Sequence, residues 1–219
     1  MNYPSVIRIR YNRGHHHPAK LTGCCCEATI TTGPLQDNTG APLADSQSDL
    51  SPIARSTWCL AVVDACLPHL DLEETESGGD FKHWRKALSK LRAFLIGDLK
   101  SESNLERFYN AFSDWEANYE TSDSLNGRIT ALVFSSTHTA FAALFDEDSD
   151  DSALIRGNIN DLYAELDTLG GDAEGLQAYW QALDTEWCEA LKTVRQRPIS
   201  SATMKLLQDT DISPFGLAA

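Results

Sequence analysis

Two groups of metal-binding residue types lie close together near the N-terminus. Residues 15–17 are three consecutive histidines, and residues 24–26 are three consecutive cysteines. Imidazole and thiolate are the ligands that zinc prefers, and the intervening residues give enough chain to bring the two groups together. Adjacent residues of an extended chain point to opposite sides, so not all of them can reach one ion. The candidate zinc ligands are His15, His17, Cys24 and Cys26.

The same residues also fit a structure without metal. Zinc ribbons separate paired cysteines by about two to four residues, and consecutive ligands depart from that spacing. A solvated histidine-containing loop beside a strand with alternately buried cysteines is the interpretation that we favour. We therefore expect no cofactor, and bound zinc is the alternative.

A second candidate for chemistry is His138, which lies in the hydroxyl-rich run Ser135-Ser136-Thr137-His138-Thr139. A nucleophile with an imidazole base is conceivable there. However, the chain has no Gly-x-Ser-x-Gly, no His-Glu-x-x-His and no glycine-rich phosphate loop. The sequence therefore predicts no catalytic residue, and a metal-dependent enzyme using the His and Cys groups stays an alternative.

Acidic residues are concentrated in the last third of the chain. The chain has 219 residues and a net charge of −14, and residues 146–189 hold thirteen acids against one cation, Arg156. Such a density attracts a basic partner and repels acidic ones. The predicted partner-binding carboxylates, with neighbouring exposed aromatic residues as anchors, are Asp146, Asp148, Asp150, Asp151, Asp161 and Glu165. A solvated face that only promotes solubility is the alternative.

The N-terminal region has the opposite charge. Residues 1–26 carry four cations and no acid. The alternation of Ile7, Ile9 and Tyr11 with arginines is typical of a half-buried strand, and residues 27–32 predict a second strand of a hairpin. The net charge argues against a general nucleic-acid binder and against docking on an anionic membrane. The basic N-terminal strand is the exception, because it could still contact nucleic acid or an acidic partner. Its candidate contact residues are Arg8, Arg10 and Arg13.

The rest of the pattern is helical. We expect residues 1–45 to form the hairpin and a linker, and residues 46–219 to form an α-helical domain. Ser51-Pro52 starts a helix that should end at Pro68, before a polar loop that leads to Asp80 as the next cap. Ser103 and Glu106 have capping-box spacing ahead of a stripe of aromatic residues. The predicted fold is mainly α, a bundle of six or seven helices with a small N-terminal β-hairpin.

Hydrophobic patterning also bears on the cell compartment. Cys59, Cys66 and Cys188 lie among apolar residues of predicted helices and are expected to be buried free thiols. No apolar run approaches the roughly 18 residues that span a bilayer, and the N-terminus lacks a signal core. The sequence thus predicts an intracellular, cytoplasmic protein.

Two helical segments carry a family resemblance. The segment 58–68 has an Asp-containing helix that ends in Leu-Pro, and the segment 85–99 has an Ala-Leu and Arg-Ala-Phe run closed by Gly97 and an acid. With the small-residue helix around His138, these segments resemble helical immunity proteins of bacterial toxin systems. The resemblance covers about residues 55–145, and it implies a helical fold and a toxin-type protein partner. It assigns no functional residue to this chain.

Three functional interpretations follow. The first is a non-enzymatic protein-binding module, an acidic inhibitor or immunity-type protein that covers a basic effector. The second is a helical subunit of a larger complex, such as a nucleoprotein complex, with the basic N-terminal strand as its contact. The third is the metal-dependent enzyme.

Overall fold

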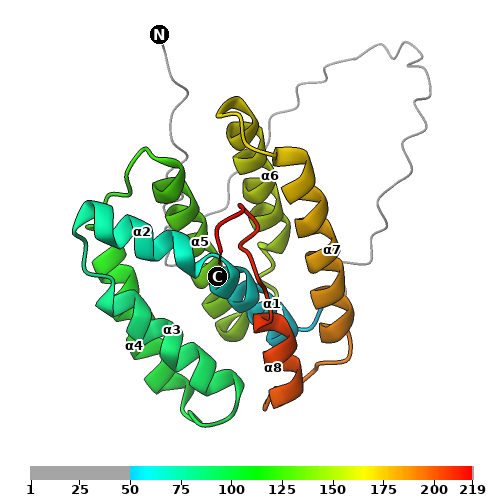
Figure 1. Cartoon of the computed structure of the whole chain (residues 1–219). Coiled ribbons are helices and arrows are strands. Elements are labelled where there is room, and N and C mark those ends of the chain that lie inside the picture. The colour runs from blue at the N-terminus through cyan, green and yellow to red at the C-terminus, as the bar shows by residue number, and fades with distance from the viewer. Residues whose placement is uncertain (1–49, 219) are drawn as a thin grey trace, which may run out of the picture. The chain divides into compact units, whose positions relative to one another are not determined.

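Eight helices form the regular structure of the computed structural model, which describes residues 50–218 (Figure 1). They are α1 (Pro52–Ala65), α2 (Leu67–Ser77), α3 (Lys82–Leu95), α4 (Glu102–Glu116), α5 (Leu125–Phe145), α6 (Ser152–Thr168), α7 (Ala173–Leu191) and α8 (Ser201–Gln208). The predicted mainly α fold is confirmed for these residues, and none of their helices is long and apolar enough to cross a membrane. The predicted hairpin and the linker lie outside the described residues, so the division into 1–45 and 46–219 stays a prediction.

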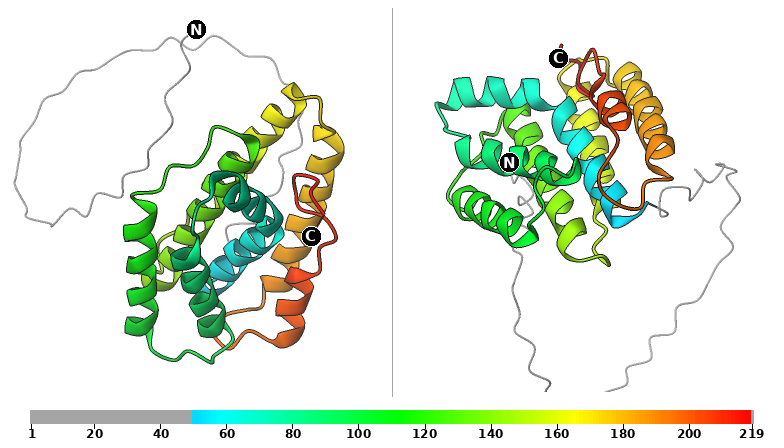
Figure 2. Two further views of the ribbon diagram at one scale, coloured as in Figure 1. Left: turned by 60° about the vertical axis from the view of Figure 1, so that its left-hand side comes forward. Right: turned by 90° about the horizontal axis from the view of Figure 1, so that it is seen from below.

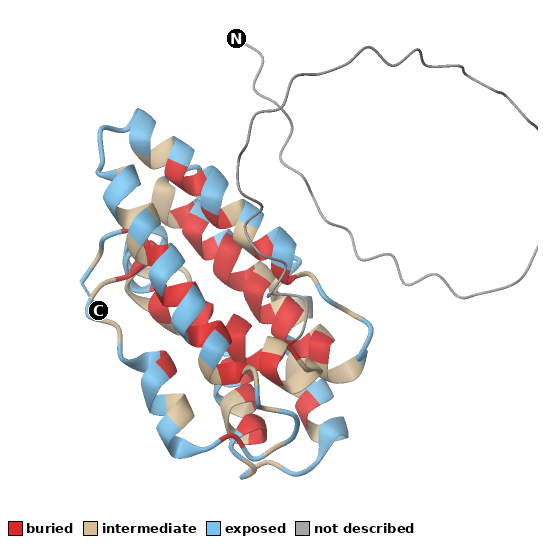
Figure 3. Ribbon diagram, turned by 90° about the vertical axis from the view of Figure 1, so that its right-hand side faces the viewer, coloured by how far each residue is buried: buried red, intermediate tan, exposed pale blue. Residues whose placement is uncertain are grey.

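Helix α1 forms the centre of the bundle. Ten of its fourteen residues are buried, including Trp58, Leu60 and Val63. A helix that is apolar on every side must be surrounded by other elements. It lies between α3 and α4 on one side and α7 and α8 on the other (Figure 2). The buried residues follow the inward faces of the helices, and the exposed residues cover the outside (Figure 3).

The predicted aromatic stripe of α4 packs into the core. Phe112, Trp115 and Tyr119 surround the ring of Phe134 on α5, with ring centroids 5.6–5.9 Å apart. Phe81, at the start of α3, meets the same ring at 5.7 Å. Most of these contacts are edge-to-face, the arrangement that aromatic quadrupoles favour. The stripe is therefore packing rather than a ligand site.

Several predicted boundaries are wrong. Pro68 does not end the first helix but occupies the first turn of α2, where its missing N–H leaves no hydrogen bond unmade. The expected polar loop is helical as far as Ser77, which raises the helix count to eight. Ser101, not Ser103, caps α4 through a hydrogen bond from the backbone N–H of Asn104, and the cap position of α3 is Phe81 rather than Asp80.

A glycine in the first turn of α5 allows the preceding loop to pack closely. A Cβ on Gly127 would overlap the carbonyl oxygen of Ser122. In an unconstrained helix Gly→Ala stabilises by roughly 1 kcal/mol, but steric overlap of this kind typically costs about 1–3 kcal/mol. We therefore expect Gly127→Ala to lower the free energy of unfolding measured in urea. The exposed helical Gly157, which has open space around its Cα, is the control, and Gly157→Ala should stabilise the chain.

Candidate functional site

The connection between α5 and α6 holds the first group of predicted carboxylates. The Oδ1 atom of Asp150 accepts hydrogen bonds from the backbone N–H and the hydroxyl of Ser152, at 3.1 and 2.6 Å. Arg55 of α1 lies 3.8 Å from the other carboxylate oxygen of Asp150 and donates to the carbonyl oxygen of Glu147. Asp146 accepts from the backbone N–H of Asp148. Asp150 thus has structural partners, whereas the side chains of Glu147 and Asp148 are exposed.

The turn between α6 and α7 holds a second group of acids. Asn160 in the middle of α6 accepts a hydrogen bond from Gln177 in the second turn of α7 at 3.2 Å, so the two helices run side by side. Exposed carboxylates follow this hairpin around the turn, and Leu169 at its tip is 66% exposed. We define the hairpin tip as Asp161, Asp167, Leu169, Asp172 and Glu174.

The six predicted carboxylates do not form one patch. Asp146, Asp148, Asp150 and Asp151 surround the start of α6, whereas Asp161 and Glu165 lie in its second half. At about 1.5 Å per residue, Asp151 and Asp161 are about 15 Å apart along the helix. Glu165 is also engaged, in an ion pair with Arg128 of α5. Among the predicted six, Asp161 is the exposed acid nearest to the turn, about 12 Å along α6 from Leu169, and we include it in the hairpin tip for that reason.

The predicted aromatic anchors are wrong. Trp180 and Trp187 of α7 are buried, and the exposed large apolar residues of the described chain are aliphatic. Leu169 is the most exposed of them and is the one that lies between acids of the hairpin tip. Its exposure could not be predicted, because the apolar periodicity of α6 continues through it.

One acid of the predicted surface lies in the core instead. Asp184 is 5% exposed and accepts from the indole N–H of Trp58 at 2.7 Å. The guanidinium of Arg156 donates to both its oxygens, at 2.9 and 3.0 Å, and lies 4.0 Å from the centroid of the Trp58 ring system. This network joins α1, α6 and α7 and fixes the hairpin on the central helix. Arg156, the one cation of residues 146–189, is therefore engaged by the buried Asp184 and not by the exposed acids of the hairpin tip.

A second buried polar network joins α2, α5 and the C-terminal segment. His69 is 4% exposed; its Nε2 lies 2.8 Å from Oγ of Ser213 and its Nδ1 lies 3.0 Å from Oδ1 of Asn126. Oγ of Ser213 accepts from the backbone N–H groups of Phe215 and Leu217. Because these bonds occupy both lone pairs, the hydroxyl donates to Nε2, and Nδ1 carries the ring proton. Burial lowers the pKa of His69, partly opposed by the bond to Asn126.

This serine, histidine and asparagine have triad-like contacts but no access for a substrate. Ser213 is fully buried. The segment is held further by Tyr163, whose hydroxyl donates to the carbonyl oxygen of Pro214 at 2.9 Å, and by a ring contact of 5.9 Å between His69 and Phe215. The network therefore fixes the C-terminal segment on the bundle. Its members are separated by 57 and 144 residues, and no local pattern marks them.

The hydroxyls around His138 serve the helix rather than a nucleophile. Thr137 and Thr139 donate to the carbonyl oxygens four residues earlier, and Thr137 also accepts from the indole of Trp84. His138 stacks on Phe112 at 4.7 Å between centroids. The hydroxyls of Ser136, Thr137 and Thr139 therefore donate to backbone carbonyl oxygens of α5 and are not paired with His138 as base.

The three cysteines predicted to be buried free thiols are confirmed. Burial raises the pKa of Cys59 and of Cys66 to about 12 and that of Cys188 to about 11. Thiols with such pKa values are protonated at neutral pH and are poor nucleophiles and metal ligands. They belong to the packing of the core.

The predicted zinc ligands His15, His17, Cys24 and Cys26 lie outside the described residues, as do Arg8, Arg10 and Arg13. Within residues 50–218, no three His, Cys, Asp or Glu side chains are grouped in a way that could hold a metal ion. The zinc and strand hypotheses stay predictions about the N-terminal segment.

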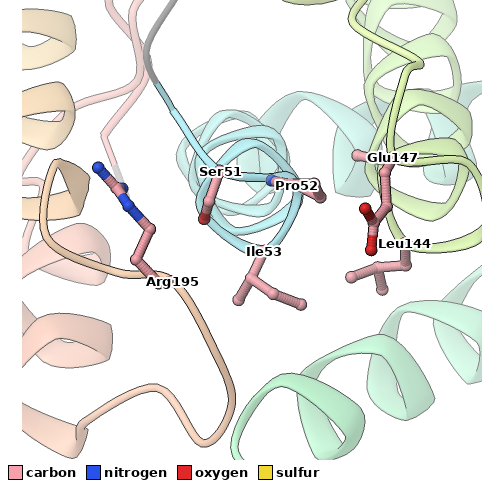
Figure 4. A pocket seen from close by; sticks show the side chains of 7 residues that line it. Ser51, Pro52, Ile53, Leu144, Glu147 and Arg195 are labelled. Atoms are coloured by element: carbon pink, nitrogen blue, oxygen red, sulfur yellow. The ribbon is translucent and has the colours of Figure 1, made fainter.

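A pocket of about 330 Å³ lies between the start of α1 and the end of α5. Ile53 and Leu144 form its apolar part, Glu147 lies beside Leu144, and the guanidinium of Arg195 extends away from them (Figure 4). The pocket is wide open and has no convergent polar groups, the feature that usually fixes a small ligand. It does not carry a functional assignment.

No protein-family model, curated protein or solved structure matches the chain. The hairpin tip offers exposed carboxylates that flank one exposed apolar side chain in the sequence, and carboxylates can form charge-assisted hydrogen bonds with lysine and arginine side chains.

Proposed function

We propose that this chain is a non-enzymatic protein-binding module whose hairpin tip covers a basic surface of another protein. The observation that carries the proposal is the exposed Leu169 between Asp167 and Asp172, both exposed and without ion-pair partners in the described chain. Carboxylates held on rigid helices lose little entropy on pairing with basic side chains. An inhibitor or immunity-type protein that covers a basic effector fits this chemistry.

The arrangement of the hairpin supports the proposal. The Arg156–Asp184 network anchors α6 and α7 on the core, so the tip projects from a fixed base. Gly170, at a φ of 80°, ends α6 and allows the tight turn that presents Leu169. A rigid apolar anchor within a charged rim is the usual anatomy of a protein interface.

We expect the double variant Asp161→Lys/Asp167→Lys to lose the partner. Reversing two charges in a contact with a basic surface replaces attraction with repulsion and should weaken binding at least about 100-fold. The measurement is quantitative mass spectrometry of proteins that co-purify with the full chain from the cells that express it. Proteins that depend on the acids should themselves be basic.

The matched control is Glu76→Lys/Glu120→Lys, which makes the same charge change at exposed acids of α2 and of the α4–α5 loop. It should retain the partner. If both variants retain the same proteins, or both lose them, the hairpin tip is not the binding surface.

A further inference from the structure

Helix α3 has a charge opposite to that of the chain. Between Lys82 and Leu95 it has five cations and no acid. Three of the cations form ion pairs: Lys82 with Asp80, Arg85 with Asp71 and Glu74, and Arg92 with Asp64. The other two, Lys86 and Lys90, form no ion pair with a carboxylate of residues 50–218.

These two lysines converge with Arg107 of α4 on one aromatic ring. The Nζ atoms of Lys86 and Lys90 lie 5.3 and 5.5 Å from the centroid of Phe108, and the guanidinium carbon of Arg107 lies 5.2 Å from it. Arg107 also lacks an ion pair among the described carboxylates. Lys86 and Arg107 are exposed, and Lys90 and Phe108 are half-buried. We call these four residues the Phe108 cluster.

This arrangement of like charges has an electrostatic cost that the chain leaves uncompensated. Positive charges four residues apart on a helix repel each other, and Arg107 adds a third. The face of Phe108 attracts cations only weakly at an exposed site. The chain has 32 acids, yet none of the described ones forms an ion pair with Lys86, Lys90 or Arg107. Unfavourable interactions that lower the stability of the folded chain are typical of binding sites, where they are retained because the function needs them.

We propose that the Phe108 cluster binds a phosphoryl dianion. Each of the three cations lies within 5.5 Å of the centroid of the Phe108 ring, so the positive charge gathers around one side chain, and a small, multiply charged anion suits it better than an extended one. A phosphoryl group offers three acceptor oxygens, of which Arg107 can take two through its planar fork, while the lysines act as point charges. An extended acidic peptide would instead need cations spread along a line. A polyanion such as DNA would be repelled by the acidic remainder of the surface.

The test is a titration of the full chain with inorganic phosphate, followed by NMR at constant ionic strength set with chloride. The expected result is saturable shifts of the Phe108 ring protons and of the Arg107 side-chain N–H. Lys86→Gln/Lys90→Gln should weaken the apparent affinity at least about tenfold, since two of the three charges are lost. The control Lys100→Gln/Lys205→Gln removes equal charge from other exposed sites and should change the affinity less than about twofold.

Thermal unfolding shows whether a variant fails to bind phosphate because the site is lost or because the chain is unfolded. Without phosphate, Lys86→Gln/Lys90→Gln should melt at the same or a higher temperature than the wild type, because repulsion is relieved. Phosphate should raise the melting temperature of the wild type and not that of the variant. If the variant unfolds, Arg107→Gln should show the same loss of affinity. Non-saturating shifts, or equal losses in variant and control, would overturn the proposal.

The source of the phosphoryl group is decided by a second titration. A tripeptide with phosphoserine at its centre is compared with the unphosphorylated tripeptide and with inorganic phosphate. Tighter binding of the phosphopeptide than of phosphate indicates a phosphorylated protein, and equal binding indicates the free ion. If a DNA duplex binds more tightly than the phosphopeptide and than inorganic phosphate, the proposal that the Phe108 cluster binds a single phosphoryl group is contradicted. The residues involved are separate from the hairpin tip, so the two proposals can fail independently.

Discussion

Replacing Asp184 with alanine is expected to lower the free energy of unfolding by about 3–5 kcal/mol. The substitution leaves the Arg156 guanidinium, whose side chain is only 12% exposed, without its counter-charge, and it leaves the indole N–H of Trp58 without its acceptor. Most of the cost comes from keeping an unpaired charge away from water. Urea unfolding followed by circular dichroism measures it.

A double variant distinguishes the contribution of the two charges to stability from that of the packing of the two side chains. In Arg156→Met/Asp184→Leu both charges are replaced by apolar side chains, and much of the lost stability should return. Glu186→Ala, at an exposed acid of the same helix, is the surface control and should change stability by less than about 0.5 kcal/mol. A loss below about 1 kcal/mol for Asp184→Ala would mean that the pair behaves as a surface ion pair.

Acidification is expected to destabilise the chain through His69. Its pKa in the folded chain lies below the ordinary value of 6.5, mainly because of burial, so between these two pKa values the unfolded chain binds more protons than the folded one. Stability should therefore fall as pH drops below about 6.5, by up to about 1.4 kcal/mol per pH unit, until the folded pKa is reached. A proton on Nε2 of His69 would also face the hydroxyl hydrogen that Ser213 donates to this nitrogen, and the hydrogen bond would be lost.

The test of this slope is a comparison with His69→Gln, unfolded in urea from pH 7.5 to 5. The two chains differ only at residue 69, so the difference between their curves reports on His69 alone. The variant is expected to be less stable at pH 7.5 and to show a shallower loss toward pH 5. Parallel curves for the two chains would show that His69 does not control the loss.

Local sequence patterns determine much of the fold. The cap Asp172, which accepts from the backbone N–H of Gly175, was predictable because a short acceptor precedes an amphipathic run. The buried cysteines followed from their apolar neighbours. Pro68 is ambiguous in the sequence because proline both ends one helix and begins another, and only the structure distinguishes the two roles here.

The candidate site was predictable only as a region. Charge counting located the excess of acids in residues 146–189, but a count cannot separate the buried Asp184 from the exposed Asp161. Asp184 is buried because it contacts Arg156 and Trp58, which lie 28 and 126 residues away from it in the sequence. Contacts of this kind cannot be read from a local pattern. The convergence of three cations on Phe108 likewise needs the packing of α3 on α4.

The salt dependence of association decides whether the hairpin tip is the binding surface. The rate constant is measured between this chain and the basic protein that co-purifies with it, at about 0.05 M and 0.5 M salt. If the hairpin tip binds that protein, the wild-type rate constant should fall at least about tenfold over this range, and Asp161→Lys/Asp167→Lys should be slow at both concentrations. Equal rate constants at the two salt concentrations, or an unchanged salt dependence in the variant, would contradict the assignment of the acidic hairpin tip as the binding surface.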